Sequence, residues 1–231
     1  MASSVSKFDA ARAEEYAVQS RIALAGYDAC HELAACLLSA ALGPESTAKI
    51  LVVGAGGTAQ EIVVAGRLEP NWHFTAVDPA PPMLAGAKAA VEAEGLSSRV
   101  AFHAGFVDDL PEAPLFDAAT LVGVLHHLPT AQSKRTILAG IASRLKPGSP
   151  FVIACNRGTY AAQSLFLTAW GRRWHMTGES TERVEARLGK ILEGANPPAS
   201  DQEIGTLLAE AGFSKPDLFF SSLFWGGWIT F

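Results

Sequence analysis

The sequence predicts an α/β fold: a doubly wound, mostly parallel, seven-stranded sheet that ends in an antiparallel hairpin and carries a helical cover near its N-terminal end. Three observations support this fold class. Short apolar runs alternate with helix-like segments from residue 50 onward, some runs such as "ATLVGVL" are apolar without a break, and the last residues resemble two apolar strands. Such alternation is typical of parallel strands linked by helices, and unbroken apolar runs fit strands that are buried on both faces.

The expected elements follow in order along the chain. Residues 8–42 have apolar positions at helical spacing with a break at Gly26, so two helices are expected before the first strand. The expected strands are 50–53, 73–77, 99–103, 116–122 and 150–155, and the expected later helices are 58–68, 81–94, 131–145, 160–174 and 200–211. Ser200 and Glu203 form a capping-box pattern at the start of the last helix. Gly226 and Gly227 predict the turn of the final hairpin.

The segment 157–199 interrupts this alternation. It contains "AWGRRWHMTGES", then an amphipathic stretch, then the loop "EGANPPAS". We interpret it as a helical insertion or lid over the site, within one domain that spans residues 1–231, because a chain of this length suits a single core.

Composition narrows the class of protein. With 49% hydrophobic and 18% charged residues, and no apolar run long enough to cross a bilayer, no membrane association is expected. No secretory signal pattern is present, so a cytoplasmic location is expected. Cys30, Cys36 and Cys155 lack metal-ligand spacing, and we expect them to be reduced packing residues. A net charge of −5 argues against a nucleic-acid partner, whereas the apolar hairpin is compatible with a homodimer.

The stretch "KILVVGAGGTAQEIV" is an apolar strand that runs into a glycine cluster and then a helix. Gly54, Gly56 and Gly57 permit a sharp turn and a close approach of a ligand to the main chain, while the next helix offers unpaired N–H groups. The spacing loosely satisfies the dinucleotide pattern. The other interpretation is a glycine-rich turn that lets the helix pack on the strand and binds no ligand. This motif alone therefore does not establish which ligand binds, or whether one does.

Asp78 ends the expected second strand. Carboxyl ends of neighbouring parallel strands meet at one crevice, so Asp78 and the glycine loop should converge there. A carboxylate at that point can accept both hydroxyls of a ribose, and it can also cap the helix that begins in "DPAPPML". An NAD-dependent oxidoreductase would fit both features, but the helices before the glycine strand and the terminal hairpin count against it.

Further segments occur in a recognisable order: "VVGAGG", "FTAVDPAPPML", "RVAFHAGFVDDLP", "FDAATLVGVLHHLP", "RLKPGSPFVIA" and "AGFSKPDLFFSSLFWGGWITF". From about residue 16 to the C-terminus, the chain resembles the class I S-adenosylmethionine-dependent methyltransferases. The upstream "SRIALAGYDACHEL" is similar to the cofactor-covering helix of a subset that includes the bacterial carboxy-S-adenosylmethionine synthase of tRNA modification. The resemblance implies a Rossmann-like methyltransferase fold, S-adenosylmethionine as cofactor and a small-molecule acceptor.

The resemblance also implies contacts to the nucleoside part of the cofactor. Asp78 would bind the ribose hydroxyls. Pro79 and Met83 would pack on one side of the adenine, and Phe106 and Val107 on the other.

For the methionine part, the resemblance implies that the backbone of Gly54, Ala55 and Gly56 lies along it. Tyr27 and Arg21 would close the site from the N-terminal helices, with Arg21 suited to the methionine carboxylate. Leu121 would direct a backbone carbonyl toward the amino group, and His126 would face the sulfonium.

Three positions depart from the family pattern. Val52 stands where an acid is common, Thr58 replaces a third glycine, and Phe106 replaces an acid that bonds the adenine amine. Glu61 is expected to supply negative charge near the cofactor amino group in their place.

Methyl transfer from a sulfonium needs in-line approach more than covalent help from the protein. His126 and His127 follow the expected fourth strand, and His126 is the candidate general base, with packing beside the cofactor as its second possible role. No metal is expected, since the histidine pair lacks further ligands at suitable spacing. Two more interpretations of the chain stay open: a carboxy-S-adenosylmethionine enzyme, and a binding protein that keeps the fold without the chemistry.

Overall fold

The computed structural model describes residues 10–231, with side chains from residue 15 onward, so residues 8 and 9 of the expected helical segment lie outside the described residues. One seven-stranded sheet has the order β3-β2-β1-β4-β5-β7-β6. Strands β1 to β5 pair in parallel, and β7 runs antiparallel between β5 and β6. The predicted sheet with its terminal hairpin is confirmed.

The strands are β1 (Lys49–Val53), β2 (His73–Asp78), β3 (Val100–Ala104), β4 (Ala118–Val122), β5 (Phe151–Asn156), β6 (Asp217–Ser222) and β7 (Trp225–Thr230). The α-helices are α2 (Ala10–Ala23), α3 (Tyr27–Leu42), α4 (Gln60–Leu68), α5 (Pro81–Ala93), α6 (Ala131–Ala142), α7 (Ser164–His175), α8 (Thr181–Gly194) and α9 (Asp201–Glu210). Short 3₁₀ turns are η1 (Ser97–Arg99), η2 (Val107–Asp109), η3 (Leu125–His127) and η4 (Tyr160–Ala162).

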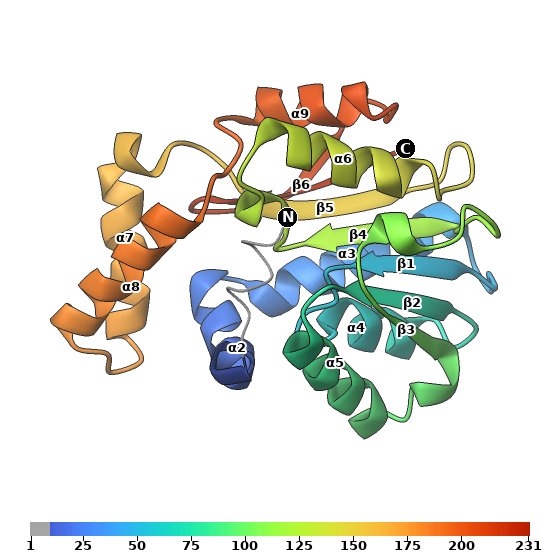
Figure 1. Cartoon of the computed structure of the whole chain (residues 1–231), viewed down its shortest axis with the longest axis horizontal. Helices are drawn as coiled ribbons and strands as arrows, with labels where there is room; N and C mark the ends of the chain where they lie inside the picture. Colours follow the sequence, from blue (N-terminus) through green and yellow to red (C-terminus); the bar gives the residue numbers. More distant parts are fainter. Residues whose placement is uncertain (1–9) are drawn as a thin grey trace.

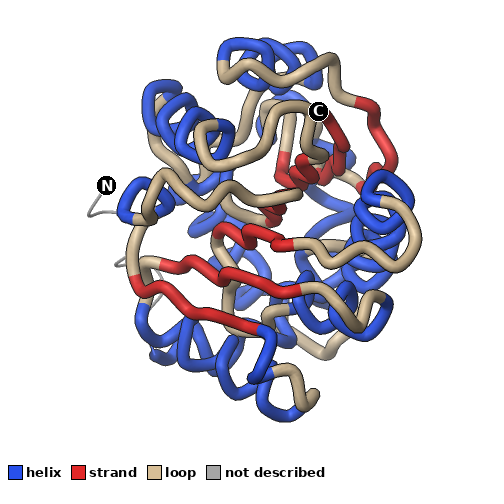
Figure 2. The backbone as a smooth tube through the Cα atoms, turned by 90° about the vertical axis from the view of Figure 1, so that its right-hand side faces the viewer, coloured by secondary structure: helices blue, strands red, loops and turns tan. Residues whose placement is uncertain are grey.

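Helices cover both faces of the sheet (Figure 2). Side chains alternate along a strand, so Ile50 and Val52 of β1 pack with α3, α4 and α5, while Leu51 and Val53 pack on the opposite face, whose cluster includes α6 and α9. Burial on both faces explains why the strands are unbroken apolar runs in the sequence.

The segment 157–199 forms η4, α7 and α8, and Figure 1 shows the pair α7 and α8 beyond the carboxyl ends of β1 and β4, next to α2. The last carbonyls of a helix have no partner inside it. Here the Ala23 carbonyl at the end of α2 accepts from Trp170 Nε1 (2.7 Å) and Trp225 Nε1 (3.1 Å), and Arg173 Nε donates to the Ile22 carbonyl (2.8 Å). These bonds fix α2 to α7 and β7.

The predicted position of the hairpin turn was wrong. Leu223 and Phe224 make the turn, with Leu223 at φ 50°, and Gly226 and Gly227 lie inside β7 opposite β5. A Cβ at Gly226 would overlap the Trp228 ring, and one at Gly227 would lie 2.9 Å from Phe219 Cζ. The two glycines therefore make room for aromatic rings that fold back over the strand.

The cysteine prediction holds in part. All three thiols are free; Cys30 and Cys155 are buried packing residues, but Cys36 is exposed on α3. Within residues 10–231, no helix has the length and apolarity that a bilayer crossing requires.

Gly226→Ala should lower the free energy of unfolding by about 1–3 kcal/mol, because the added methyl must displace the Trp228 ring in a packed layer. Gly189→Ala is the matched control: it lies inside α8 with open space around it, so it should stabilise the protein by about 0.5–1 kcal/mol. Urea unfolding measures both, and equal stability of the two variants would contradict the packing role of Gly226.

Candidate active site

Two adjoining cavities lie at the carboxyl ends of the parallel strands. The smaller, of about 270 Å³, lies among the ends of β1, β2 and β4, and the larger, of about 700 Å³, is walled by α2, α7, α8 and the hairpin. Their linings share five residues: Tyr16, Gly54, Val122, Gly123 and His127. A long ligand can therefore extend from one cavity into the other past Gly54.

The loop after β1 forms the wall between the two cavities. Gly54 has φ 72°, its N–H donates to the Val77 carbonyl (2.7 Å), and a Cβ on it would overlap Val124. Gly86 of α5 allows a second close approach, because its Cβ would lie 2.8 Å from the Gly57 carbonyl oxygen. Side chains at these two positions would push the loop away from its neighbours.

Asp78 lines the smaller cavity at the end of β2. Its Oδ2 accepts from Gly56 N (3.1 Å), and its Oδ1 accepts from Ala80 N (2.9 Å), one residue before α5. Burial raises the pKa of this carboxyl group, and the two backbone donors oppose that shift. Asp78 thus holds the loop through Gly56 N, caps α5 through Ala80 N and still lines the smaller cavity.

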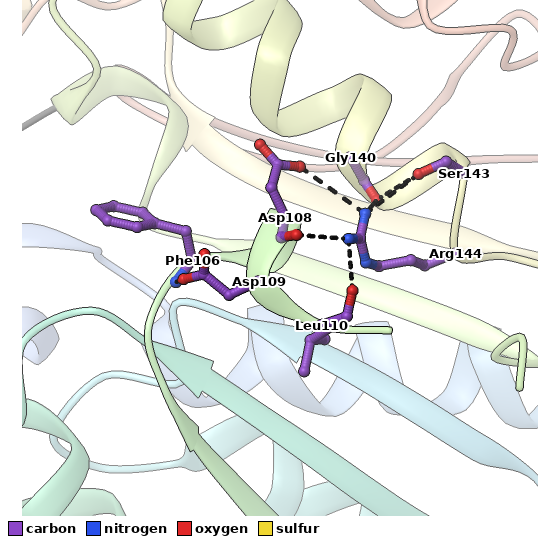
Figure 3. A network of polar contacts seen from close by, with 7 residues as sticks. All are labelled: Phe106, Asp108, Asp109, Leu110, Gly140, Ser143 and Arg144. Atoms are coloured by element: carbon purple, nitrogen blue, oxygen red, sulfur yellow. Dashed lines mark hydrogen bonds and ion pairs between the residues drawn. The ribbon is translucent and has the colours of Figure 1, made fainter. Parts of the chain in front are cut away.

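Apolar side chains from two segments complete the lining of the smaller cavity. Phe106 and Val107 come from the loop after β3, and Pro79 and Met83 come from the start of α5 and the residues just before it. Arg144 holds the loop that follows Val107, as Figure 3 shows: its Nη2 donates to the carbonyls of Asp108 (2.9 Å) and Leu110 (2.7 Å).

Two further contacts shape this loop. Phe106 N donates to Asp109 Oδ2 (2.7 Å), and a Cβ at Gly140 of α6 would overlap the Asp108 carboxylate. The role of Arg144 was not predicted from the sequence. The one sequence signal for it was its position four residues after Gly140, because this spacing lets Arg144 Nη1 donate to the Gly140 carbonyl (3.0 Å).

At the far end of the loop after β1, the larger cavity is lined by a cluster of Tyr27, His31, Thr58 and Glu61. Tyr27 Oη hydrogen-bonds Thr58 Oγ1 (2.8 Å), and burial raises the pKa of this phenol to about 12. His31 Nδ1 lies 2.8 Å from the Tyr27 carbonyl, which can only accept, so Nδ1 carries the proton. The lone pair of His31 Nε2 then lies on the Glu61 side, 3.8 Å from Glu61 Oε2.

Glu61 is a buried acid without a strong cationic partner. Burial raises its pKa to about 8 and lowers the pKa of His31 to about 4, so both groups are uncharged at neutral pH. Among the ion pairs of the described residues, none joins Glu61 to a lysine or an arginine. The cluster therefore forms a part of the cavity wall at which a ligand cation would supply the ion-pair partner that Glu61 lacks.

The cavity linings include Tyr27, Gly54, Ala55, Gly56 and the other expected contact residues, but not Arg21 or Leu121. Arg21 pairs with Asp28 (2.6 Å) and lies over the Tyr27 ring, 4.5 Å from its centroid. Leu121 is fully buried within β4, and the next two residues of the chain reach the cavities instead.

His126 lines the larger cavity and is buried. Asn156 N donates to His126 Nδ1 (3.3 Å), so the neutral ring carries its proton on Nε2. Its ring packs against His127 with centroids 4.2 Å apart and meets the Trp225 ring edge-on. Asn156 was not predicted as a site residue; its signal was a polar residue that ends the apolar run "FVIACN".

Among the residues that the structure describes, no three histidine, cysteine, aspartate or glutamate side chains gather in a metal-ligand arrangement. The buried polar groups of this site include two carboxyl groups, those of Asp78 and Glu61, and the His126 ring, beside a backbone loop and aromatic walls.

Comparison with known proteins gives a family match and several similar folds. Residues 50–148 match the family model described as "Methyltransferase domain". No curated protein sequence matches the chain. The chain is similar in structure to an O-methyltransferase family 2 protein from Planctomyces limnophilus, solved in complex with apigenin, at 20% identity and a TM-score of 0.62, covering 85% of this chain and 54% of that one.

Two further structures have the same fold. An O-methyltransferase family protein from Burkholderia thailandensis has 19% identity and a TM-score of 0.59, with 92% of this chain and 61% of that one covered. Human N-acetylserotonin methyltransferase, in complex with S-adenosylmethionine, has 15% identity and a TM-score of 0.57, with 85% and 50% covered.

The chain spans about half to two thirds of the length of the solved structures that it matches. Strand order, loop geometry and the match over residues 50–148 agree with one another. Residues 50–148 therefore match a methyltransferase domain, and the chain has the fold of the solved methyltransferase structures.

Proposed function

We propose that this protein transfers a methyl group from S-adenosylmethionine to an oxygen of a small molecule. The observation that carries the proposal is the pair of buried carboxyl groups that line the two joined cavities, Asp78 in the smaller and Glu61 in the larger. S-adenosylmethionine has a ribose diol and an ammonium group on opposite sides of its sulfonium. Each group matches one carboxyl group in charge or in hydrogen-bonding capacity.

The same pair argues against a dinucleotide. A pyrophosphate against the glycine loop would bring no cation to the wall that Glu61 lines, and its negative charge would oppose ionisation of this buried acid. The ammonium of methionine instead supplies the cation that the Glu61 cluster lacks. A methyltransferase is therefore favoured over an NAD-dependent oxidoreductase.

The residues of the chain fit distinct parts of the cofactor. Asp78 would accept hydrogen bonds from the ribose hydroxyls. On one side of the adenine would pack Pro79, just before α5, and Met83 of α5; on the other side would pack Phe106 and Val107 of the loop that Arg144 holds. The backbone of Gly54, Ala55 and Gly56 would border the methionine part, with Tyr27 beside it. Bound there, the cofactor supplies an electrophilic methyl group.

For His126 we propose a hydrogen-bond donor role. Its Nδ1 accepts from the Asn156 backbone, so in the neutral ring Nε2 carries the proton and can donate it but has no lone pair with which to accept another. A general-base role would require the lone pair of Nδ1, and therefore the loss of the bond to Asn156. Positioning of the acceptor by the walls of the larger cavity would supply most of the rate increase.

The acceptor class follows from the larger cavity and from the neighbours. Its lining includes the buried indoles Trp170, Trp174 and Trp225, which suit a flat apolar molecule. One structural neighbour was solved with apigenin, a phenolic compound, and several are O-methyltransferases. A single domain over residues 1–231, a cytoplasmic location and a homodimer remain predictions.

A carboxy-S-adenosylmethionine enzyme is the second candidate, and one observation favours it. Arg187 and Lys190 of α8 line the larger cavity and could face an extra carboxylate, although Arg187 already pairs with Glu179 (3.5 Å). Native mass spectrometry of the purified protein separates the two, because a bound ligand heavier by one carboxylate would support this candidate.

Asp78→Ala should weaken binding of S-adenosylhomocysteine by about 1–3 kcal/mol, because two charge-assisted hydrogen bonds to the ribose are lost. Titration calorimetry measures the loss, and Asp217→Ala, at an exposed position at the start of β6, is the matched control. Unchanged affinity in a folded Asp78→Ala protein would remove Asp78 from the cofactor site.

Glu61→Gln should stabilise the ligand-free protein at pH 8 and above, by about 1–3 kcal/mol. Because its pKa is higher in the folded than in the unfolded protein, Glu61 contributes fully to stability only below its usual pKa, where it is protonated in both states. This contribution is lost as the pH rises through its folded-state pKa of about 8. The exposed Glu32→Gln on α3 is the control.

Thermal unfolding across pH 5–9, a range set by that pKa shift, measures the effect. The advantage of the Gln variant over the wild type should grow as the pH rises from about 5 to about 8 and then level off, while its affinity for S-adenosylhomocysteine falls. A gain that does not depend on pH would mean that Glu61 is not a buried, uncharged acid.

A further inference from the structure

We propose that the side-chain oxygen of Asn156 accepts a hydrogen bond from the hydroxyl of the methyl acceptor, which makes the substrate a flat aromatic alcohol of the phenol type. The inference rests on the proposed function, because it concerns the substrate side of the same site. It follows from which polar groups around the larger cavity already have partners and which do not.

The indole walls of the larger cavity present carbon rather than N–H groups. Trp170 Nε1 and Trp225 Nε1 both donate to the Ala23 carbonyl, and Trp174 Nε1 donates to Gln19 Oε1 (3.0 Å). Since these donors are already used to hold α2, the three rings offer an apolar surface to a ligand. Such walls select a flat body, and they leave its polar group to be recognised elsewhere.

Asn156 supplies a polar group that is not satisfied. The residue is only 2% exposed and it lines the larger cavity, with Nδ2 donating to Tyr160 Oη (2.8 Å). Its Oδ1 has no hydrogen-bond partner among the described residues. A buried oxygen in this state is costly, and a ligand that donates a hydrogen to it removes that cost.

The position of Asn156 is held from several sides. Its backbone N–H donates to His126 Nδ1, it pairs with Trp225 across the β5–β7 ladder, and Tyr160 holds its amide nitrogen. The neighbouring strand β4 is followed by Gly123, whose N–H donates to the Ala154 carbonyl of β5 (2.8 Å). Gly123 lines both cavities, so the end of β5 lies beside the place where acceptor and cofactor would meet.

An amide oxygen at this place discriminates between substrate and product. A phenol donates its hydrogen to Oδ1, whereas the methyl ether that results from the reaction has no hydrogen to donate. Leaving a buried acceptor unpaired penalises the ether. Asn156 is therefore a specificity residue that favours binding of the hydroxyl form and release of the methylated form.

The test uses the complex of the protein with S-adenosylhomocysteine and two matched probes, 2-naphthol and 2-methoxynaphthalene. Titration calorimetry should give the wild type a preference for the naphthol of about threefold to tenfold, the effect of one neutral hydrogen bond. Asn156→Ala and Asn156→Ser should reduce that preference to near one. Asn71→Ala, an exposed asparagine in the loop between α4 and β2, should retain it.

A crystal structure of the wild-type complex soaked with 2-naphthol provides the second readout, which needs no variant. The naphthol oxygen should lie within hydrogen-bond distance of Asn156 Oδ1. Equal affinity for the two probes, absence of binding by either, or a hydroxyl that bonds another group would overturn the inference while S-adenosylhomocysteine still binds. Failure of S-adenosylhomocysteine itself to bind would instead overturn the proposed function, and this inference with it.

Discussion

The close approach of one loop to the ends of its neighbouring strands is the constraint on which the site depends. The Gly54 N–H bonds the Val77 carbonyl, the Gly56 N–H bonds Asp78, and α5 touches the loop at Gly86. Because Gly54 and Gly86 leave no room for a side chain, the loop is fixed to β2, β4 and α5 at once. As a consequence, Gly54 is among the residues that line both cavities, and a ligand that contacts both carboxyl groups passes beside it.

The cover over the site depends on bonds between distant parts of the chain. The Ala23 carbonyl accepts from indoles 147 and 202 residues away in sequence. These bonds give the last carbonyl of α2 its hydrogen-bond donors. Because the indole N–H groups are used in this way, the rings present only carbon to the larger cavity. The hydrogen-bonding need of a helix end and the chemical character of the larger cavity are therefore linked: a change that frees an indole N–H would loosen the cover and make the cavity wall polar.

Periodicity and apolar runs were sufficient to predict the sheet, its parallel strands and the hairpin, because these depend on burial that repeats along the chain. The predicted turn at Gly226 and Gly227 was wrong because a glycine in a sequence marks either a turn or a position where an aromatic ring packs against the backbone. Only the packing of Trp228 and Phe219 in the structure distinguishes the two. Boundaries of short helices also shifted: the helix expected at 160–174 begins at Ser164, after a 3₁₀ turn. The lining of the cavities was predictable where it is made of backbone and strand ends, as at Gly54.

Side chains that act through distant partners were harder to predict. Arg21 was expected at the cofactor, but its guanidinium pairs with Asp28, a partner in the first turn of the next helix that periodicity does not reveal. Arg144 and Asn156 act through three-dimensional partners, the loop at Asp108 and the ring of His126, and so gave only weak local signals.

The most direct test of the cofactor site is calorimetric titration of S-adenosylhomocysteine and NAD at pH 7 in two buffers that differ in ionisation enthalpy. Because burial raises the pKa of Glu61 to about 8, its carboxyl group is protonated before binding and must ionise to pair with the ammonium. S-adenosylhomocysteine should therefore bind with release of up to about one proton, this release should disappear in Glu61→Gln, and NAD should bind more weakly. Binding of NAD alone, or binding of S-adenosylhomocysteine with no proton exchange, would contradict the assignment of Glu61 to the cofactor ammonium.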